Sequence, residues 1–222
     1  MKYMKAIDIS MDIDNSMWCY KGSWSNTITE ISSTNKGDQS TAYKFELFSH
    51  TGTYIETSQH KLKNNIILDE YDIDCFICKV KVLIIDNNLD SINLEDVINE
   101  LRKNSLTLND GDSLIIANGW GHTKQHETDF ISGSPHYSKE LVNYLSNIKL
   151  NLIGVDTPVI DSNIKAYGAV KQMFERNERL LLLAPLALDI RKVKTGEYFI
   201  NALPIKVRNV SASLCRPILI EL

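Results

Sequence analysis

The segment from residue 50 to residue 60 reads HTGTYIETSQH and carries two imidazoles, a carboxylate and a phenol. His50, Glu56 and His60 offer the donor types that zinc and manganese accept, and a catalytic metal site needs about three protein ligands and a water. A metal-bound water ionises near neutral pH and can attack a carbonyl group. The same histidines could instead only form hydrogen bonds within surface loops. The spacing alone leaves both interpretations open.

The elements on either side predict how this segment is held. Tyr43, Phe45 and Leu47 alternate with polar residues, which is the period of a strand with these three facing inward, so His50 should lie near a strand end. Further along, apolar strands alternate with amphipathic helices, and one helix begins after the capping candidate Asn93. Strand, helix and strand at these spacings favour parallel pairing. We expect a single α/β domain over residues 1–222, built on a mixed central sheet.

Composition narrows the class of partner. The chain has 222 residues, of which 43% are hydrophobic and 23% charged, with a formal net charge of -4 and a pI near 5.7. A nucleic-acid partner is not expected, because a phosphate-binding surface needs clustered excess lysine and arginine. No stretch approaches the roughly 18 apolar residues of a spanning helix, and the first residues do not read as a signal peptide. We therefore expect a cytoplasmic protein that does not bind a membrane.

The quoted segment resembles a family signature. His50, Gly52, Thr53 and His60 match the motif HxGTHxDxPxH of the cyclase family, which includes bacterial kynurenine formamidases and isatin hydrolases. IDIS near the start, NGWG at 118–121, GVDTPVIDS at 154–162 and EYFINALPIKV at 197–207 are similar to further landmarks of that family, in the same order. The resemblance covers nearly the whole chain. It implies a swivelling β/β/α domain, a homodimer or homotetramer, and a metal-dependent hydrolase that opens an amide or lactam of a small-molecule substrate.

The resemblance also implies roles for single residues. In the family, the first two histidines and the aspartate of the motif bind metal, and the last histidine moves protons. A later histidine and glutamate, twelve residues apart, complete the site. Here Tyr54 stands at the second histidine, Glu56 at the aspartate and Ser58 at the proline. Alignment on the leucines of NERLLLLAPLALDI places the later pair on Asn177 and Asp189.

Three functions follow from this reading. In the first, His50, Glu56 and Asp189 hold a divalent ion, and the oxygen-rich set favours manganese or magnesium over zinc. In the second, no metal is needed: His60, oriented by Glu56, acts as a base and Tyr54 as a proton donor in a lyase, dehydratase or cyclase. In the third, catalysis is absent and the scaffold binds a ligand or partner.

Two further residues are candidates for the wall of a substrate pocket. Trp120 in NGWG could line a pocket for an aromatic substrate, because such pockets are often walled by aromatic side chains. It could equally belong to the core. Asn177 is expected to add a weak oxygen donor beside the site.

Overall fold

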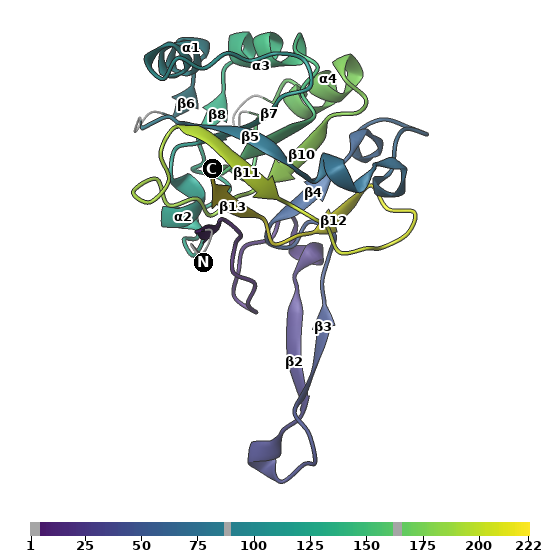
Figure 1. The fold of residues 1–222 in the computed structure, drawn as a ribbon. Helices are drawn as coiled ribbons and strands as arrows, with labels where there is room; N and C mark the ends of the chain where they lie inside the picture. The colour runs from purple at the N-terminus through teal and green to yellow at the C-terminus, as the bar shows by residue number, and fades with distance from the viewer. Residues whose placement is uncertain (1–4, 87–89, 162–165) are drawn as a thin grey trace.

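One curled sheet of nine strands forms the body of the protein in the computed structural model, which describes residues 5–86, 90–161 and 166–222. The strand order is β1-β13-β11-β5-β7-β9-β10-β4-β12 (Figure 1). The strands are β1 (Ala6–Asp8), β4 (Tyr54–Glu56), β5 (Ile77–Ile84), β7 (Ser113–Ala117), β9 (Leu152–Val155), β10 (Leu181–Ala184), β11 (Gly196–Asn201), β12 (Ala212–Leu214) and β13 (Ile218–Glu221).

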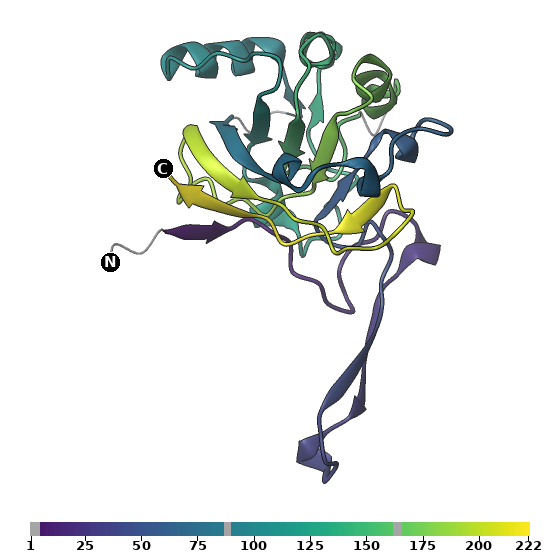
Figure 2. The same cartoon turned by 45° about the vertical axis from the view of Figure 1, so that its right-hand side comes forward.

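The centre of the sheet is parallel, as the sequence predicted. Strands β5, β7, β9 and β10 pair in parallel, and the chain crosses between them through α1 (Leu94–Lys103), α3 (Lys139–Ser146) and α4 (Ala169–Arg176). These three helices cover the same face of the sheet (Figures 1 and 2). Strands β7, β9 and β10 are buried along their whole length, which explains their nearly continuous apolar sequences. The expected α/β architecture with a mixed sheet is confirmed.

Antiparallel strands flank this parallel centre on both sides. Strands β11, β13 and β1 extend one side, and β4 and β12 extend the other. In the pairing of β4 with β10, Glu56 lies opposite Leu182 and Tyr54 lies opposite Ala184. The signature segment is therefore fixed beside the last parallel strand. None of the helices among the described residues is long and apolar enough to cross a lipid bilayer.

The remaining elements are short. Strands β6 (Ser91–Ile92) and β8 (His136–Tyr137) form a small parallel pair, and α2 (Trp120–Lys124) follows β7. Within the described residues, five single-turn 3-10 helices lie in the connections: η1 (Gly22–Trp24), η2 (Thr34–Lys36), η3 (Ser58–His60), η4 (Leu68–Glu70) and η5 (Ile73–Cys75).

A separate hairpin extends away from the body. Strands β2 (Thr27–Ser32) and β3 (Ala42–Glu46) pair only with each other (Figures 1 and 2). The predicted strand at 43–47 is present over 42–46, but the prediction that Tyr43, Phe45 and Leu47 face inward is wrong. They are 51%, 61% and 36% exposed. Alternation of apolar and polar residues reveals which side chains share a face, and it cannot reveal whether the same chain covers that face.

The packing of α2 depends on one glycine. A Cβ built at Gly121 would lie 1.8 Å from the carbonyl oxygen of Leu186 and 2.7 Å from that of Asp156. Both neighbours are backbone atoms, so they cannot move aside as a flexible side chain would. The turn after β7 can therefore approach β9 and the chain after β10 only because residue 121 lacks a side chain.

We expect Gly121→Ala to lower the free energy of unfolding by about 2–3 kcal/mol, because overpacking against fixed backbone forces the helix to shift. Gly196→Ala is the matched control, since a Cβ at Gly196 meets nothing within 4 Å. Urea denaturation of both variants measures the effect. Equal stability of the two variants would contradict the close approach described here.

Candidate functional site

Three side chains of the signature segment converge on one carboxylate oxygen. His50 Nε2 lies 3.1 Å from Glu56 Oε2, and His60 Nε2 lies 3.6 Å from the same atom. One ligand atom from each residue lies within 4.8 Å of the other two. The Glu56 side chain is only 4% exposed, and the His50 side chain 9%. The structure thus places a nearly buried carboxylate between two imidazoles.

The backbone around β4 explains the Gly-Thr pair of the motif. Gly52 has φ 63°, and a Cβ there would lie 2.8 Å from Ile13 Cγ1, so glycine suits both the conformation and the space. Thr53 Oγ1 accepts a hydrogen bond from the Met11 backbone N–H (2.9 Å) and donates one to the Pro185 carbonyl (2.6 Å). Thr53 therefore ties the segment between His50 and Glu56 to two distant parts of the chain.

Local turns aim the two imidazoles at Glu56. The Ser49 hydroxyl lies 2.8 Å from His50 Nδ1, which leaves Nε2 directed at the carboxylate. The 3-10 turn η3 returns the chain so that His60 lies four residues after Glu56, with its ring centroid 4.5 Å from that of His50. Burial lowers the pKa of His60, and the neighbouring Glu56 carboxylate partly opposes that effect. His60 is thereby favoured in its neutral form, in which a ring nitrogen can accept a proton or a metal ion.

Two tyrosines, the buried Tyr54 and the half-buried Tyr20, lie beside the cluster. The Tyr20 hydroxyl donates a hydrogen bond to the Pro158 carbonyl (2.7 Å) and lies 3.1 Å from the Tyr54 hydroxyl. A hydroxyl has a single hydrogen, so Tyr54 is the donor in the contact between the two tyrosines. Burial raises the pKa of both phenols. Tyr54 also contacts the cluster directly, because its ring centroid lies 4.4 Å from that of His50.

A cavity of about 580 Å³ opens beside these groups. Its polar lining includes His50, Glu56 and His60 together with the lysines 21, 61 and 171. Apolar side chains come from β9, β10, α4 and the loop at 158–160, and aromatic ones are Tyr20, Trp24 and Tyr54. The volume lies within the range of about 300–1,000 Å³ that is common for small-molecule sites. The cavity joins a group of possible metal ligands to a largely apolar wall.

Asp189 does not join this cluster, which differs from the expectation that it would complete a set of ligands with His50 and Glu56. Its carboxylate accepts hydrogen bonds from Arg191 (2.9 and 3.0 Å) and lies 3.5 Å from His122 Nε2. The hydrogen bonds from the Arg191 side chain hold the pKa of Asp189 well below its usual range. The reason is the path of the chain: after β10 ends, Ala187 N–H bonds to the Ile9 carbonyl, which leads the chain away from β4.

Asn177 and Trp120 also lie apart from the cavity that they were expected to line. Asn177 ends α4 and donates from Nδ2 to the Leu150 carbonyl (2.7 Å). Trp120 donates from Nε1 to the Phe130 carbonyl (2.9 Å) and packs in a small core cluster with Phe130. Strand β10 and helix α4 do line the cavity, but with other side chains. Strand β10 contributes Leu182 and Ala184, and α4 contributes Val170 and Lys171.

Sequence reasoning missed several residues of the cavity. Tyr20, Lys21 and Trp24 come from the segment MWCYKGSW, whose aromatic content is a visible signal in the sequence. Trp24 lies beside the cluster, with its ring centroid 5.9 Å from that of His50. Lys61 directly follows the last motif histidine. No periodicity links positions near 20 to position 50, so only the folded chain brings them together.

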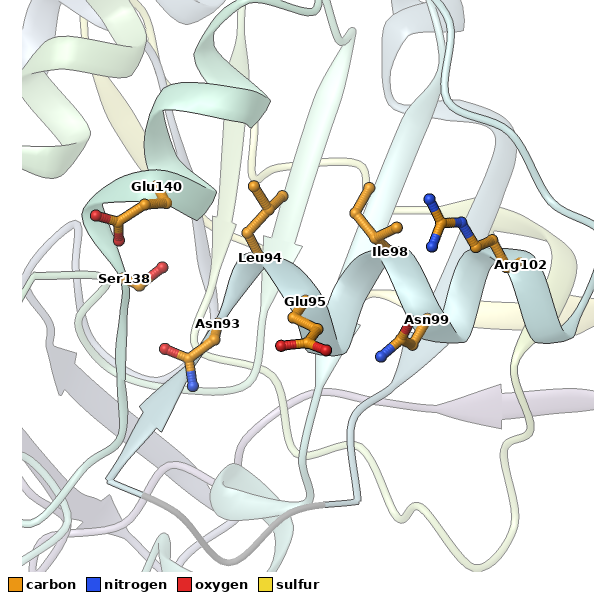
Figure 3. Close-up of a pocket in the computed structure, with 8 residues that line it drawn as sticks. All are labelled: Asn93, Leu94, Glu95, Ile98, Asn99, Arg102, Ser138 and Glu140. Atoms are coloured by element: carbon orange, nitrogen blue, oxygen red, sulfur yellow. The ribbon is translucent and has the colours of Figure 1, made fainter.

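A second hollow, shown in Figure 3, lies between α1 and the first turn of α3. It has a volume of about 420 Å³ and is lined by Asn93, Leu94, Glu95, Ile98, Asn99, Arg102, Ser138 and Glu140. This lining contains no imidazole and no thiol. In the described part of the chain, His50, Glu56 and His60 form the group of histidine, cysteine and acidic side chains that is compact enough to hold a metal ion. The cavity beside them is therefore the candidate site.

Comparison with known proteins identifies the family. Residues 7–162 match the model of the family described as "Putative cyclase". The chain belongs to this cyclase family. A kynurenine formamidase of Bacillus thuringiensis subsp. konkukian is 28% identical over 228 residues, and one of Bacillus anthracis is 26% identical over 220, each match covering 99% of both chains.

Solved structures share the fold of this cyclase-family chain. A "predicted metal-dependent hydrolase" from Bacillus stearothermophilus superposes with a TM-score of 0.79 at 20% identity, covering 99% of this chain and 100% of the other. Isatin hydrolase A from Ralstonia solanacearum gives a TM-score of 0.83 at 15% identity, with coverage of 99% and 92%. At these identities the likeness establishes the fold.

We expect Thr53→Val to lower the free energy of unfolding by about 1–3 kcal/mol, because it leaves the Met11 N–H and the Pro185 carbonyl without their buried partner. Thr53→Ser keeps the hydroxyl and is the matched control. Guanidinium denaturation should separate the two variants. If the serine variant loses as much stability as the valine variant, the two hydrogen bonds are not what the hydroxyl contributes.

Proposed function

We propose that this cyclase-family chain is a hydrolase that opens the carbonyl C–N bond of a small-molecule amide or lactam, with a divalent metal ion held by His50, Glu56 and His60. The observation that carries the proposal is the convergence of three ligand atoms within 4.8 Å at the wall of a small-molecule cavity. The likeness to kynurenine formamidases over 99% of the chain supports the choice of bond.

The donor set fits a metal ion, and best fits zinc. Two imidazoles and one carboxylate make up the ligand set of several catalytic zinc sites, which keep a further position open. This replaces the oxygen-rich set expected from the sequence, in which Asp189 stood where His60 now stands, and with it the reason to prefer manganese or magnesium. The Ser49 hydroxyl beside His50 Nδ1 is the kind of outer contact that fixes the tautomer and orientation of a metal-binding imidazole.

The chain's own residues prepare the site in three ways. If the proton of His50 is on Nδ1, toward the Ser49 hydroxyl, Nε2 could offer its lone pair to an ion in place of its hydrogen bond with Glu56. The apolar side chains of β9, β10 and the 158–160 loop exclude water and so strengthen electrostatic interactions at the cluster. The three lysines attract negative charge on a ligand or on the carboxylate that hydrolysis releases. When bound, a divalent ion supplies Lewis acidity that polarises a carbonyl group and activates water for attack.

Metal-free acid and base catalysis is the second candidate. One observation favours it: burial lowers the pKa of His60, so a neutral imidazole lies 3.6 Å from the orienting Glu56. Such a pair could remove a proton from a substrate in an elimination or ring closure. Tyr54 lines the same cavity and donates its hydrogen to Tyr20 in this structure; its service as a proton donor to a substrate stays a prediction.

The first test is zinc binding. After treatment with a chelator and equilibrium dialysis against zinc, we expect about one zinc per wild-type chain. Glu56→Gln and His60→Ala should weaken binding by at least about 100-fold, because each removes one of three ligands. The dialysed samples are measured by atomic emission.

Asp189→Asn is the control for this experiment, because Asp189 is held by Arg191 outside the cluster. It should bind zinc as the wild type does. A wild-type chain that takes up no zinc would overturn the proposed metal site. So would zinc binding that Asp189→Asn weakens and Glu56→Gln leaves intact.

The second test is turnover. We expect the zinc-loaded protein to hydrolyse members of a panel of aryl formamides and aryl lactams, followed by the absorbance of the released amine. Chelation should reduce the rate by at least about 100-fold, and added zinc should restore it. A rate that survives chelation and falls about 100-fold or more in His60→Ala would favour the metal-free candidate instead.

A further inference from the structure

The cavity beside the cluster carries an excess of positive charge. Among the described residues, Lys21, Lys61 and Lys171 line it, and the acidic side chains in the lining are those of Glu56 and Asp161. The chain as a whole has 24 lysines and arginines against 28 acidic residues. The excess of cations at the cavity therefore runs against the composition of the chain and is a property of this site.

Both carboxylates in the lining already have partners. Glu56 lies between two imidazoles. Asp161 accepts three hydrogen bonds (2.8, 2.8 and 2.9 Å) from the backbone N–H groups of residues 167–169, where α4 begins. The N-terminus of a helix carries a partial positive charge, which offsets a carboxylate placed there. Neither acid is left to neutralise the lysines.

The three lysines, in contrast, keep their charge available. Within the described ranges, Lys21 and Lys61 form no ion pair. Lys171 pairs with Glu175, and the two side chains are 55% and 51% exposed. An exposed pair of this kind contributes little to stability, so Lys171 can exchange its partner for a ligand. A ligand in the cavity can thus meet three ammonium groups from three separate parts of the chain.

Two of these ammonium groups lie near the cluster. Lys61 directly follows His60, and while burial is the main cause of the lowered pKa of His60, the Lys61 charge contributes in the same direction. Lys21 Nζ lies 4.7 Å from the centroid of the Trp24 ring, which itself lies 5.9 Å from that of His50. An anionic group held by these lysines would therefore lie beside the candidate metal ligands.

The rest of the lining suits an aromatic ring. Tyr20, Trp24 and Tyr54 line the cavity together with aliphatic side chains of β9, β10 and α4. The Trp24 ring is supported from behind the lining by Phe48, with centroids 6.0 Å apart and planes 14° apart. Aromatic side chains favour the packing of a flat ring against them. The lining thus joins an aromatic, apolar wall to a group of lysines.

We propose that Lys21, Lys61 and Lys171 form a subsite for an acidic substituent, so that the cavity selects anionic aryl amides over neutral and cationic ones. The ring would pack against the aromatic wall, and the same charges that attract an acidic group would repel a ligand that carries an ammonium group. The proposal names the substrate class of the proposed hydrolase and rests on that function for the reaction. Binding of the anion needs neither metal nor turnover.

The first experiment measures binding alone. Chelator-treated protein is titrated calorimetrically with the three isomers of aminobenzoate and with the matching aminobenzamides, whose carboxamide has the shape of the carboxylate without its charge. We expect the best aminobenzoate to bind at least about 10-fold more tightly than its benzamide at low ionic strength, and this advantage to shrink in about 0.5 M sodium chloride. Equal affinities, or no binding by any aminobenzoate, would overturn the proposal.

Variants then locate the subsite. Lys21→Gln and Lys61→Gln should each reduce the advantage of the aminobenzoate by about 3- to 10-fold, because each removes one charge a few ångströms from the ligand. Lys63→Gln is the matched control, since Lys63 is also exposed, lies two residues after Lys61 and is outside the lining of the cavity. It should bind as the wild type does. If Lys63→Gln weakens binding as much as Lys61→Gln, the overall charge of the chain and not a subsite is responsible.

Turnover separates this proposal from the proposed hydrolase function. The zinc-loaded protein should hydrolyse the best formamidobenzoate with a kcat/KM at least about 10-fold above that of the matching formamidobenzamide. Equal hydrolysis together with equal binding would overturn the subsite and leave the hydrolase standing. Binding that favours the aminobenzoate, without hydrolysis of any formamide or lactam, would overturn the hydrolase and the substrate class but support the anion subsite.

Discussion

The candidate site depends on keeping the Glu56 carboxylate almost out of water. A carboxylate in such a position is costly unless charged or hydrogen-bonding groups surround it. Here two imidazoles approach one of its oxygens, and both come from within six residues of Glu56. Three features hold these groups together: the Gly-Thr turn, the antiparallel pairing of β4 with β10, and the 3-10 turn after β4. Removal of either imidazole therefore disturbs the environment of the carboxylate as well as the number of ligands.

The sequence predicted those parts of the fold that repeat a local pattern. Apolar strands alternating with amphipathic helices indicated the parallel centre, and the motif around His50 indicated the cluster. Asp189 and Asn177 lie outside the cluster that the structure forms, and the sequence signal that proposed them was an alignment on a run of leucines, which carries little information on register. On β10, Leu182 and Ala184 line the part of the cavity where a donor was expected. The exposure of Tyr43 and Phe45 could not be predicted either, because alternation along β3 does not show whether the rest of the chain covers that face.

The arrangement of donors sets what this member of the family can hold. Tyr54 stands where the motif has its second histidine, and the nearby parts of β10 and α4 face the cavity with Leu182, Ala184, Val170 and Lys171. The first three have no ligand atom, and a lysine ammonium repels a cation. Three donors in one place suit a single ion with an open position. A site for two ions would require donors that Leu182, Ala184, Val170 and Lys171 do not offer.

The hydrogen bond from Tyr20 to the Pro158 carbonyl has a consequence for selectivity. It gives the pair of phenols a fixed polarity: Tyr54 donates to Tyr20, Tyr20 donates to Pro158, and the last acceptor is a backbone oxygen that cannot reverse the direction. Tyr54, which lines the cavity, then has only lone pairs left to offer a ligand. A ligand that places an N–H at that point can donate a hydrogen bond to the Tyr54 oxygen. A ligand that places an ether or ester oxygen there is disfavoured, because its lone pairs face those of Tyr54.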